Sequence, residues 1–143
     1  MQPTSGGRRT IPATFLPALL LIACFAAAPV AADEVPTFRK GMWEYDTSVL
    51  LNGKQFHSTE SQCGDPTDSV KALLAPSLPK GCKVDGPNRL GNTYTISAIC
   101  PEGRSDVVLT VDGDAGFMEV IESKMGETSS KQTLTAHRTG DCQ

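Results

Sequence analysis

The stretch that decides the fold covers residues 41–63 and reads GMWEYDTSVLLNGKQFHSTESQC. From Trp43 onward, side chains suited to a buried face alternate with polar ones, which is the two-residue period of a half-buried β-strand. Asn52-Gly53 then favours a two-residue type I′ turn, because both central positions of that turn need positive φ. The stretch therefore predicts a β-hairpin with strands at 41–51 and 54–63.

Pairing across the predicted turn fixes which residues of the hairpin face each other. Val49 lies opposite Phe56, and Tyr45 lies opposite Glu60. Because the side chains of a strand alternate between its two faces, one face of the hairpin collects most of its large apolar groups. This predicted inner face consists of Trp43, Tyr45, Val49 and Phe56.

A short helix is predicted directly after the hairpin. The segment Asp65-Pro66-Thr67-Asp68 offers two acids as helix caps and a proline suited to the first turn. An apolar stripe follows at helical spacing, and Pro76 and Pro79 end the helix. The stripe, which consists of Val70, Leu73 and Leu74, predicts a helix that covers an open side or end of a sheet.

Five further strands are predicted in the second half of the chain, at 82–89, 93–100, 105–111, 117–124 and 130–138. Their expected inward residues are Tyr94, Ile96, Ala98, Cys100, Val107, Leu109, Val111, Leu134 and Ala136. The strands are joined mostly by short turns, and one helix follows the second strand. This order predicts a mainly β fold, a seven-strand antiparallel meander that forms either a curled sheet or a partly closed barrel.

The N-terminal segment has the three-part pattern of a secretory signal peptide. Residues 1–12 are polar and basic, residues 13–28 are apolar and uncharged, and small residues follow as far as Ala32. This pattern predicts a signal peptide at 1–32 and a single disulfide-stabilised β domain at 33–143. The apolar run is shorter than the roughly 20 residues that span a membrane, so no transmembrane span is predicted.

An alternative processing site lies inside the apolar run. Leu21-Ile22-Ala23-Cys24 is similar to a bacterial lipoprotein box, in which Cys24 is lipidated and becomes the new N-terminus. The apolar run continues past Cys24 as far as Ala28, and a better small-residue site follows. Cleavage after Ala32 and a soluble periplasmic product are therefore the preferred prediction, and a lipid anchor through Cys24 is the alternative.

Removal of the signal peptide makes the chain more acidic. Eleven of the 13 basic residues and all 16 acidic residues remain, so the formal charge changes from −3 to −5. The remaining 111 residues form one small domain, which excludes a multidomain enzyme. The acidic balance argues against a nucleic-acid partner, because phosphate contacts need clustered positive charge.

Four cysteines remain after either processing route: Cys63, Cys82, Cys100 and Cys142. The sequence has no C-x-x-C motif, which disfavours a redox or zinc site, and an even set in an exported domain predicts two disulfides. A three-residue loop centred on Gly91 sets Cys82 opposite Cys100, and a last strand beside the first brings Cys142 near Cys63. The preferred pairing is Cys82–Cys100 with Cys63–Cys142, and Cys63–Cys82 with Cys100–Cys142 is the alternative.

Several short motifs follow one another in a specific order along the chain. They are Gly41-Met42-Trp43-Glu44, Gln62-Cys63, Cys82-Lys83, Gly91-Asn92-Thr93-Tyr94-Thr95-Ile96 with Cys100, and His137-Arg138-Thr139-Gly140-Asp141-Cys142. The set resembles the exported bacterial domain-of-unknown-function family 3617, an uncharacterised family found behind signal peptides in Gram-negative bacteria. Met42 stands where leucine is commoner, and Cys142 lies almost at the end of the chain. The resemblance implies a periplasmic location and no known activity, cofactor or catalytic residue.

One polar group of residues lies on the outer face of the predicted hairpin. Ser48 lies opposite His57, and Asp46 is one step along the same face. A Ser–His–Asp grouping is the pattern of a nucleophilic hydrolase, but an open strand face lacks the dry cleft and the oxyanion hole that such chemistry needs. A solvated polar face is the preferred interpretation, and a hydrolase-like enzyme is the alternative function.

Two further patterns concern metal ions. His57 and His137 are the only histidines, and they approach each other and Asp46 if the last strand lies beside the first. Asp112-Gly113-Asp114 is similar to the start of a calcium loop, but it lacks further carboxylates at the required spacing, and a hairpin turn explains it. We therefore expect two separate surface histidines, no metal site and no cofactor.

Apolar side chains of the inner face are the remaining functional candidates. They line a ligand cavity if the sheet curls into a barrel, and otherwise they form a packed core, which is the preferred interpretation. These residues are Trp43, Tyr45, Val49, Phe56 and Tyr94. The sequence thus predicts an uncharacterised periplasmic protein, a non-enzymatic binding or interaction module whose partner is an envelope protein or a small apolar ligand.

Overall fold

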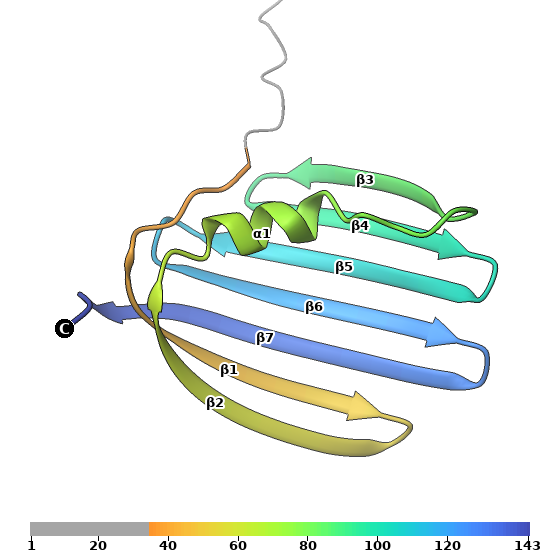
Figure 1. The fold of residues 1–143 in the computed structure, drawn as a ribbon, viewed down its shortest axis with the longest axis horizontal. Helices are drawn as coiled ribbons and strands as arrows, with labels where there is room; N and C mark the ends of the chain where they lie inside the picture. Colours follow the sequence, from red (N-terminus) through yellow and green to blue (C-terminus); the bar gives the residue numbers. More distant parts are fainter. Residues whose placement is uncertain (1–34) are drawn as a thin grey trace, which may run out of the picture. The chain divides into compact units, whose positions relative to one another are not determined.

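The computed structural model describes residues 35–143, so the predicted signal peptide at 1–32 and its Cys24 lie outside the described residues. Seven strands and one helix make up the described part of the chain (Figure 1). In chain order they are β1 Gly41–Leu51, β2 Lys54–Gly64, α1 Thr67–Leu74, β3 Lys83–Leu90, β4 Thr93–Cys100, β5 Gly103–Asp112, β6 Gly116–Met125 and β7 Thr128–Gly140.

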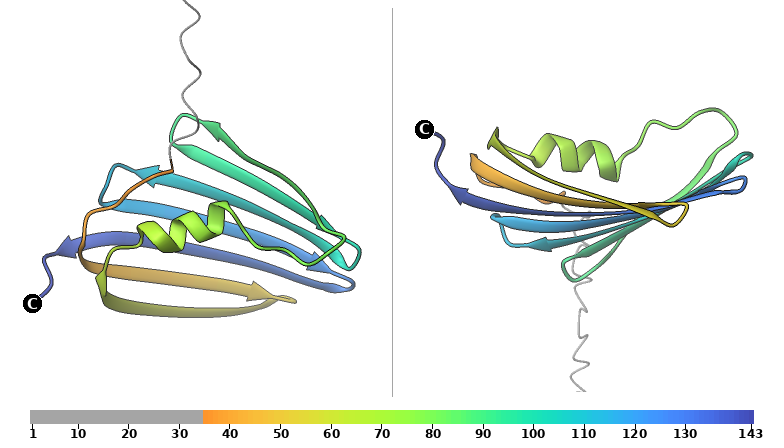
Figure 2. Two further views of the ribbon diagram at one scale, coloured as in Figure 1. Left: turned by 45° about the horizontal axis from the view of Figure 1, so that its top comes forward. Right: turned by 90° about the horizontal axis from the view of Figure 1, so that it is seen from below.

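One antiparallel sheet contains all of these strands, in the order β2-β1-β7-β6-β5-β4-β3. Strands that follow each other in sequence are neighbours, except β2 and β3, and β1 pairs with β7. The sheet is open, with β2 and β3 at its edges, and it curves around the side that carries α1 (Figure 2). The predicted seven-strand antiparallel sheet with a helix after the second strand is confirmed, and its shape is the curled sheet.

The first hairpin has the register that its turn predicts. Val49 pairs with Phe56, and Tyr45 pairs with Glu60. Asn52 has φ of 46° and Gly53 has φ of 82°, as a type I′ turn requires. The turn is also fastened to β7, because Asn52 donates its backbone N–H to the carbonyl of Ser129 at 3.1 Å. The Asn52 Oδ1 accepts the Ser129 N–H in return at 3.0 Å.

The helix begins where the sequence places an acid and a proline. Pro66 occupies the N-cap position, so neither of the two acids that were considered is the N-cap residue. Asp65, which precedes Pro66, accepts the backbone N–H of Thr67 at its Oδ1, at 2.9 Å. Hydrogen bonds from Thr67 hold the pKa of the Asp65 carboxyl below its ordinary value. The eight-residue helix turns Val70 and Leu74 toward the sheet. Within residues 35–143, no helix has both the length and the apolar character needed to cross a membrane.

The core lies between α1 and the sheet face beneath it, which we call the inner face. Trp43 is fully buried there, with its ring 5.8 Å from that of Phe38 and 6.2 Å from that of Phe117. Phe38 also donates its N–H to the buried hydroxyl of Thr67 at 2.9 Å, which ties the segment before β1 to the helix. The core consists of Phe38, Trp43, Val70, Leu74, Tyr94, Ile96, Leu109, Val111, Phe117 and Ala136.

Phe56 lies on the inner face by register, as predicted, but it is not part of this core. Its register with Val49 is correct, but its side chain is 55% exposed. β2 is an edge strand, and α1 crosses the other half of the sheet, on the left in Figure 1. Phe56 therefore has a neighbour on one side only and no helix above it, and Val49 beside it is only half-buried.

The edge strand β3 contains an irregularity that the sequence pattern did not reveal. The loop between β3 and β4 has two residues, Gly91 and Asn92, and not the three that were predicted, because Leu90 pairs with Thr93. The register against β4 then shifts between Asp85 and Asn88, around Gly86-Pro87, and this shift brings Cys82 opposite Cys100. Gly86 has φ of 108°, and a Cβ there would lie 2.5 Å from the carbonyl oxygen of Thr95, so only glycine fits. Proline lacks the N–H of a ladder hydrogen bond and is tolerated here because the strand is at an edge.

Two disulfides fasten the ends of the strands, in the pairs that the sequence reasoning preferred. Cys63 is bonded to Cys142, with 5.5 Å between their Cα atoms, and this bond joins the end of β2 to the residues after β7. Cys82 is bonded to Cys100, with 4.1 Å between the Cα atoms, across the β3–β4 hairpin. The first bridge closes a separation of 79 residues and the second one of 18 residues.

We predict that the purified protein contains these same bridges. Proteolysis without reduction, followed by mass spectrometry, should recover one linked peptide pair with Cys63 and Cys142 and another with Cys82 and Cys100. A linked peptide with Cys63 and Cys82 would contradict the pairing.

The two bridges should also differ in their contribution to stability. In the chain-entropy description the longer loop contributes about 4.5 kcal/mol and the shorter about 3 kcal/mol. The double variant Cys63→Ala/Cys142→Ala should therefore lose more free energy of unfolding in urea than Cys82→Ala/Cys100→Ala. Each double variant is the control for the other, and equal or reversed losses would contradict this order.

Candidate functional site

A hollow of about 330 Å³ opens on the inner face beside α1. Its volume is at the lower end of the range for small-molecule sites. The lining comes from both ends of the chain and from the helix. It consists of Tyr45, Thr47, Glu60 and Gln62 from the first hairpin, Pro66, Ser69 and Val70 at α1, Phe117 and Glu119 from β6, and Gln132 and Leu134 from β7.

The pairing of β1 with β7 brings these residues together. Thr47 pairs with Leu134, and Leu134 pairs with Glu119, so the three side chains form a row across β1, β7 and β6. Leu109 of β5 continues the row on the other side of Glu119. Because paired residues lie on the same face of a sheet, the register itself places a carboxylate between two leucines.

Glu119 is the unusual residue of this hollow. Its side chain is only 9% exposed, and Phe117 precedes it by two residues on the same face. No described residue forms a hydrogen bond or ion pair with its carboxylate, and burial alone raises the pKa of Glu119 above its ordinary value. No fully enclosed side-chain oxygen or nitrogen in residues 35–143 lacks a partner. The Glu119 oxygens therefore contact solvent, and they do so through the hollow that they line.

The charged side chains that line the hollow are both acidic. Glu60 is a second carboxylate in its lining, and the described lining residues include no Lys, Arg or His. Burial raises the pKa of the Tyr45 hydroxyl, and the nearby negative charge of Asp65 raises it further. The polar groups that remain are hydroxyls and amides, which carry no net charge. Carboxylates without basic neighbours give this part of the inner face a negative potential.

The five apolar residues considered from the sequence lie in different environments in the structure. Trp43 and Tyr94 belong to the packed core. Tyr45 lines the hollow, Val49 is half-buried, and Phe56 is exposed. Because the sheet stays open, a barrel cavity around Trp43 does not form.

Sequence reasoning missed Glu119, although a signal was present. In the predicted strand 117–124 the inner positions are Phe117, Glu119 and Ile121, so a charged residue stands where the alternation calls for an apolar one. An acid at such a position is costly when buried without a partner, and it indicates a functional role. The sequence reasoning predicted a strand at 117–124 but assigned none of its residues to the inner face.

The Ser48, His57 and Asp46 grouping lies on the outer face, as predicted. Ser48 pairs with His57 across the hairpin, but the Ser48 hydroxyl accepts a hydrogen bond from the amide of Gln55 at 3.3 Å. His57 Nε2 is 3.5 Å from Asp46 Oδ2, and both side chains are about half exposed. An open and solvated arrangement of this kind supports no proposal of catalysis.

The metal alternatives do not assemble. β7 does lie beside β1, but His137 pairs with Glu44 whereas His57 pairs with Ser48, so four residues of β1 separate them. Four residues correspond to roughly 13 Å along a strand. Asp112-Gly113-Asp114 forms the turn between β5 and β6, and Asp114 is paired with Arg39 at 2.8 Å. Residues 35–143 contain no group of three or more potential metal ligands.

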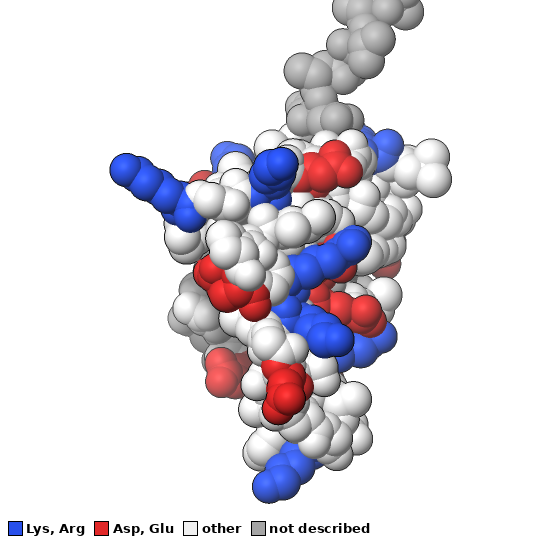
Figure 3. Space-filling view, turned by 90° about the vertical axis from the view of Figure 1, so that its right-hand side faces the viewer, with Lys and Arg blue, Asp and Glu red and all other residues white. Residues whose placement is uncertain are grey.

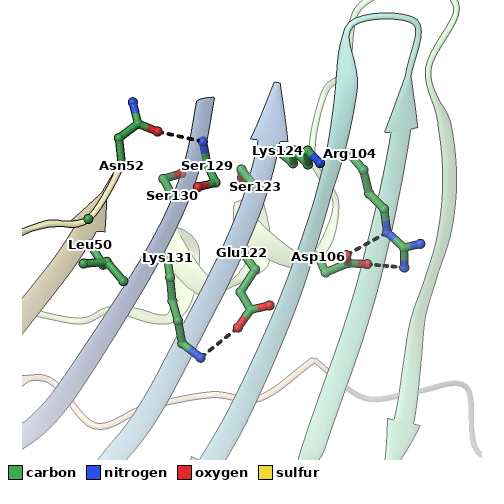
Figure 4. Close-up of a pocket in the computed structure, with 11 residues that line it drawn as sticks. Leu50, Asn52, Arg104, Asp106, Glu122, Ser123, Lys124, Ser129, Ser130 and Lys131 are labelled. Carbon is green, nitrogen blue, oxygen red and sulfur yellow. Dashed lines mark hydrogen bonds and ion pairs between the residues drawn. The ribbon is translucent and has the colours of Figure 1, made fainter. Parts of the chain in front are cut away.

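A second hollow, of about 400 Å³, lies where β5, β6 and β7 approach the Asn52-Gly53 turn, and Figure 4 shows its lining. Its acidic groups are paired. Lys131 lies 2.7 Å from Glu122, and Arg104 lies 2.7 Å from Asp106. All four side chains are at least 39% exposed. This hollow is a solvated charge network, whereas the inner-face hollow contains an acid without a partner.

The charges at this end of the sheet are of both signs. Figure 3 shows basic and acidic side chains interspersed over the surface that faces right in Figure 1. Neither sign forms a continuous patch in that view, so the surface offers no basic track for a nucleic-acid backbone. The inner-face hollow is therefore the candidate functional site.

Comparison with known proteins identifies a protein family that this chain matches. The model of the family described as "Protein of unknown function (DUF3617)" matches residues 38–142, which is most of the chain. No curated protein and no solved structure matches the sequence. The matched range begins at Phe38 and ends at Cys142, so it includes the whole sheet, the helix and both disulfides.

We predict that Glu119→Gln stabilises the protein at neutral pH by roughly 1–2 kcal/mol, because it removes a buried charge that has no partner. The pKa of Glu119 is higher in the folded than in the unfolded state. The wild-type protein therefore loses stability as pH rises from the unfolded pKa through the folded one. The gain of Glu119→Gln should vanish below about pH 4, where the carboxyl is protonated in both states.

Urea unfolding, followed by the fluorescence of the lone Trp43, measures this difference at both pH values. The matched control is Glu122→Gln, the same change on the outer face of β6, which loses an ion pair with Lys131 and should give no gain. A Glu119→Gln variant that is less stable than wild type at neutral pH would show that the carboxylate has a stabilising partner.

Proposed function

The chain belongs to the DUF3617 family, and we propose that it is an exported, non-enzymatic binding module that holds a small ligand with an apolar body in its inner-face hollow. The observation that carries this proposal is the hollow itself. Phe117, Leu134 and Val70 supply apolar wall, and hydroxyl and amide groups from Thr47 and Gln132 lie in the same lining. Small-molecule sites combine apolar walls with polar groups, and this hollow has both, with six polar residues among its eleven lining residues.

The placement of α1 supports a binding role for the inner face. The helix packs its buried residues against one half of the sheet, and the other half has no helix over it (Figure 1). Exposed apolar side chains lie on the uncovered part of this face, among them Phe56 and Met125. A ligand that lies along the edge of the helix would cover apolar surface that now faces water, which is favourable.

The proposed location is the periplasm of a Gram-negative bacterium. The pattern at 1–32 supports export, and both disulfides of the domain are of the kind that persist in an oxidising compartment. We propose cleavage after Ala32 and a soluble domain that begins at Asp33. Lipidation of Cys24 is the competing outcome.

Mass spectrometry of the protein recovered from the periplasm of an expressing Gram-negative bacterium tests the processing. We expect an intact mass that corresponds to residues 33–143 with four cysteines oxidised. A Cys24→Ala variant should be processed in the same way, because Cys24 lies upstream of the proposed cleavage site. An N-terminal acylated Cys24 in the wild-type protein, lost in the variant, would replace soluble export with a lipid anchor.

Native mass spectrometry of the same material tests the binding role. We expect a retained small molecule, and we expect Ser69→Trp to abolish its retention, because Ser69 is an exposed lining residue and an indole there fills the hollow. The matched control is Asp68→Trp, which adds the same side chain one residue earlier, outside the lining. Its loss of an exposed ion pair with Lys71 should matter little.

Two results would count against small-molecule binding. A bare monomer would contradict a retained ligand. A co-purifying protein that stays bound to Ser69→Trp would replace the small ligand with an envelope-protein partner at another surface.

A further inference from the structure

We infer that the ligand of the inner-face hollow carries a protonated nitrogen, which pairs with the carboxylate of Glu119. This inference rests on the proposed function of the hollow as a small-molecule site and specifies the chemistry of its ligand. It assigns Glu119 as the residue that selects a cationic amphiphile, a molecule with an apolar body and one ammonium group.

The first argument is the missing partner of Glu119. A carboxylate in an apolar setting is costly unless an opposite charge or hydrogen-bond donors compensate for the lost water. Leu109 and Leu134 flank Glu119 in register, and no group in residues 35–143 compensates its charge. On the outer face of the same sheet, by contrast, Glu122 is paired with Lys131 and Asp106 is paired with Arg104.

The second argument is the direction in which Glu119 is accessible. The side chain is nine-tenths buried and lines the hollow, so a ligand that enters the hollow meets its oxygens. An ammonium group there forms a charge-assisted hydrogen bond with the carboxylate, which is stronger than a hydrogen bond between neutral groups. The apolar body of the ligand then lies against Phe117, Leu134 and Val70.

The third argument is the sign of the surroundings. Glu60 is the other carboxylate of the lining, Asp65 lies near Tyr45, and the described lining offers no basic side chain. An anionic ligand would be repelled by these charges, and a neutral ligand would leave the negative charge of Glu119 uncompensated. A cation is the one charge state that the described lining favours.

Three probes of one length test the inference: octylamine, which is protonated at neutral pH, 1-octanol and octanoate. Titrations followed by NMR report where each probe binds. Methyl resonances of Val70 and Leu134 report on the hollow, and those of Val108, which is exposed on the outer face, serve as the spatial control. We expect octylamine to shift the hollow resonances and to bind about tenfold or more tightly than octanol.

Two substitutions then isolate the contribution of Glu119. Glu119→Gln should remove the preference for octylamine over octanol and leave the affinity for octanol within about twofold. Glu122→Gln changes the net charge by the same amount from the opposite face of β6 and should keep the preference.

Acidification should also remove the preference in the wild-type protein as Glu119 becomes protonated. Glu60, Tyr45 and Asp65 are the other titratable groups at the hollow, so a matched titration of Glu60→Gln separates the exposed carboxylate from the buried one.

The outcomes distinguish this inference from the function on which it rests. If all three probes shift the hollow resonances with similar affinity, the binding role stands and the inference is overturned. The inference is also overturned if octanoate binds best, because Glu119 would then act as a neutral hydrogen-bond donor. If none of the three probes shifts the hollow resonances while Trp43 fluorescence shows a folded protein, both the inference and the proposed function are overturned.

Discussion

The pairing of β1 with β7 is the constraint on which the rest of this structure depends. It joins the first hairpin to the last strand of the chain, across a separation of 87 residues where Thr47 pairs with Leu134. A two-stranded hairpin is marginally stable alone, so β1 and β2 need β7 to become part of a sheet. Long-range pairing of this kind has a large loop-closure cost. The chain offsets that cost at both ends of the interface, with the Cys63–Cys142 bridge at one end and the Asn52–Ser129 hydrogen bonds at the other.

The same pairing creates the inner-face hollow. Its lining combines residues of the first hairpin and the helix with residues of β6 and β7. The hollow therefore forms only when these two parts of the chain are joined. The helix follows β2 directly and must cross back over the sheet to reach β3, which places α1 beside the hollow. Phe38, tied to Thr67, fixes the helix over the core half of the face. The part of the face that α1 leaves uncovered is therefore a consequence of topology.

The local features of this fold could be predicted from the sequence, because each depends on a few neighbouring residues. Asn52-Gly53 determines the register of the first hairpin, and Asp65-Pro66 begins the helix. The Cys82–Cys100 pair was predicted correctly from a three-residue loop, but the loop has two residues, and the register shift between Asp85 and Asn88 brings the two cysteines together. The features that were missed depend on what lies above a given strand residue. Strand alternation and register place Phe56 and Tyr45 on the same face of the sheet. The position of α1 determines that Phe56 is exposed whereas Tyr45 lines a hollow.

Glu119 shows how an exception to a pattern becomes informative once the fold is known. In sequence it is one acid in a strand that carries one other glutamate and a lysine. In the sheet, Glu122 lies on the outer face with Lys131 as its partner, whereas Glu119 lies between leucines with none. An acid kept only for solubility belongs on the outer face, and an acid kept only for stability has a partner. Glu119 meets neither description, so its position is best explained by something that the folded chain does not itself contain.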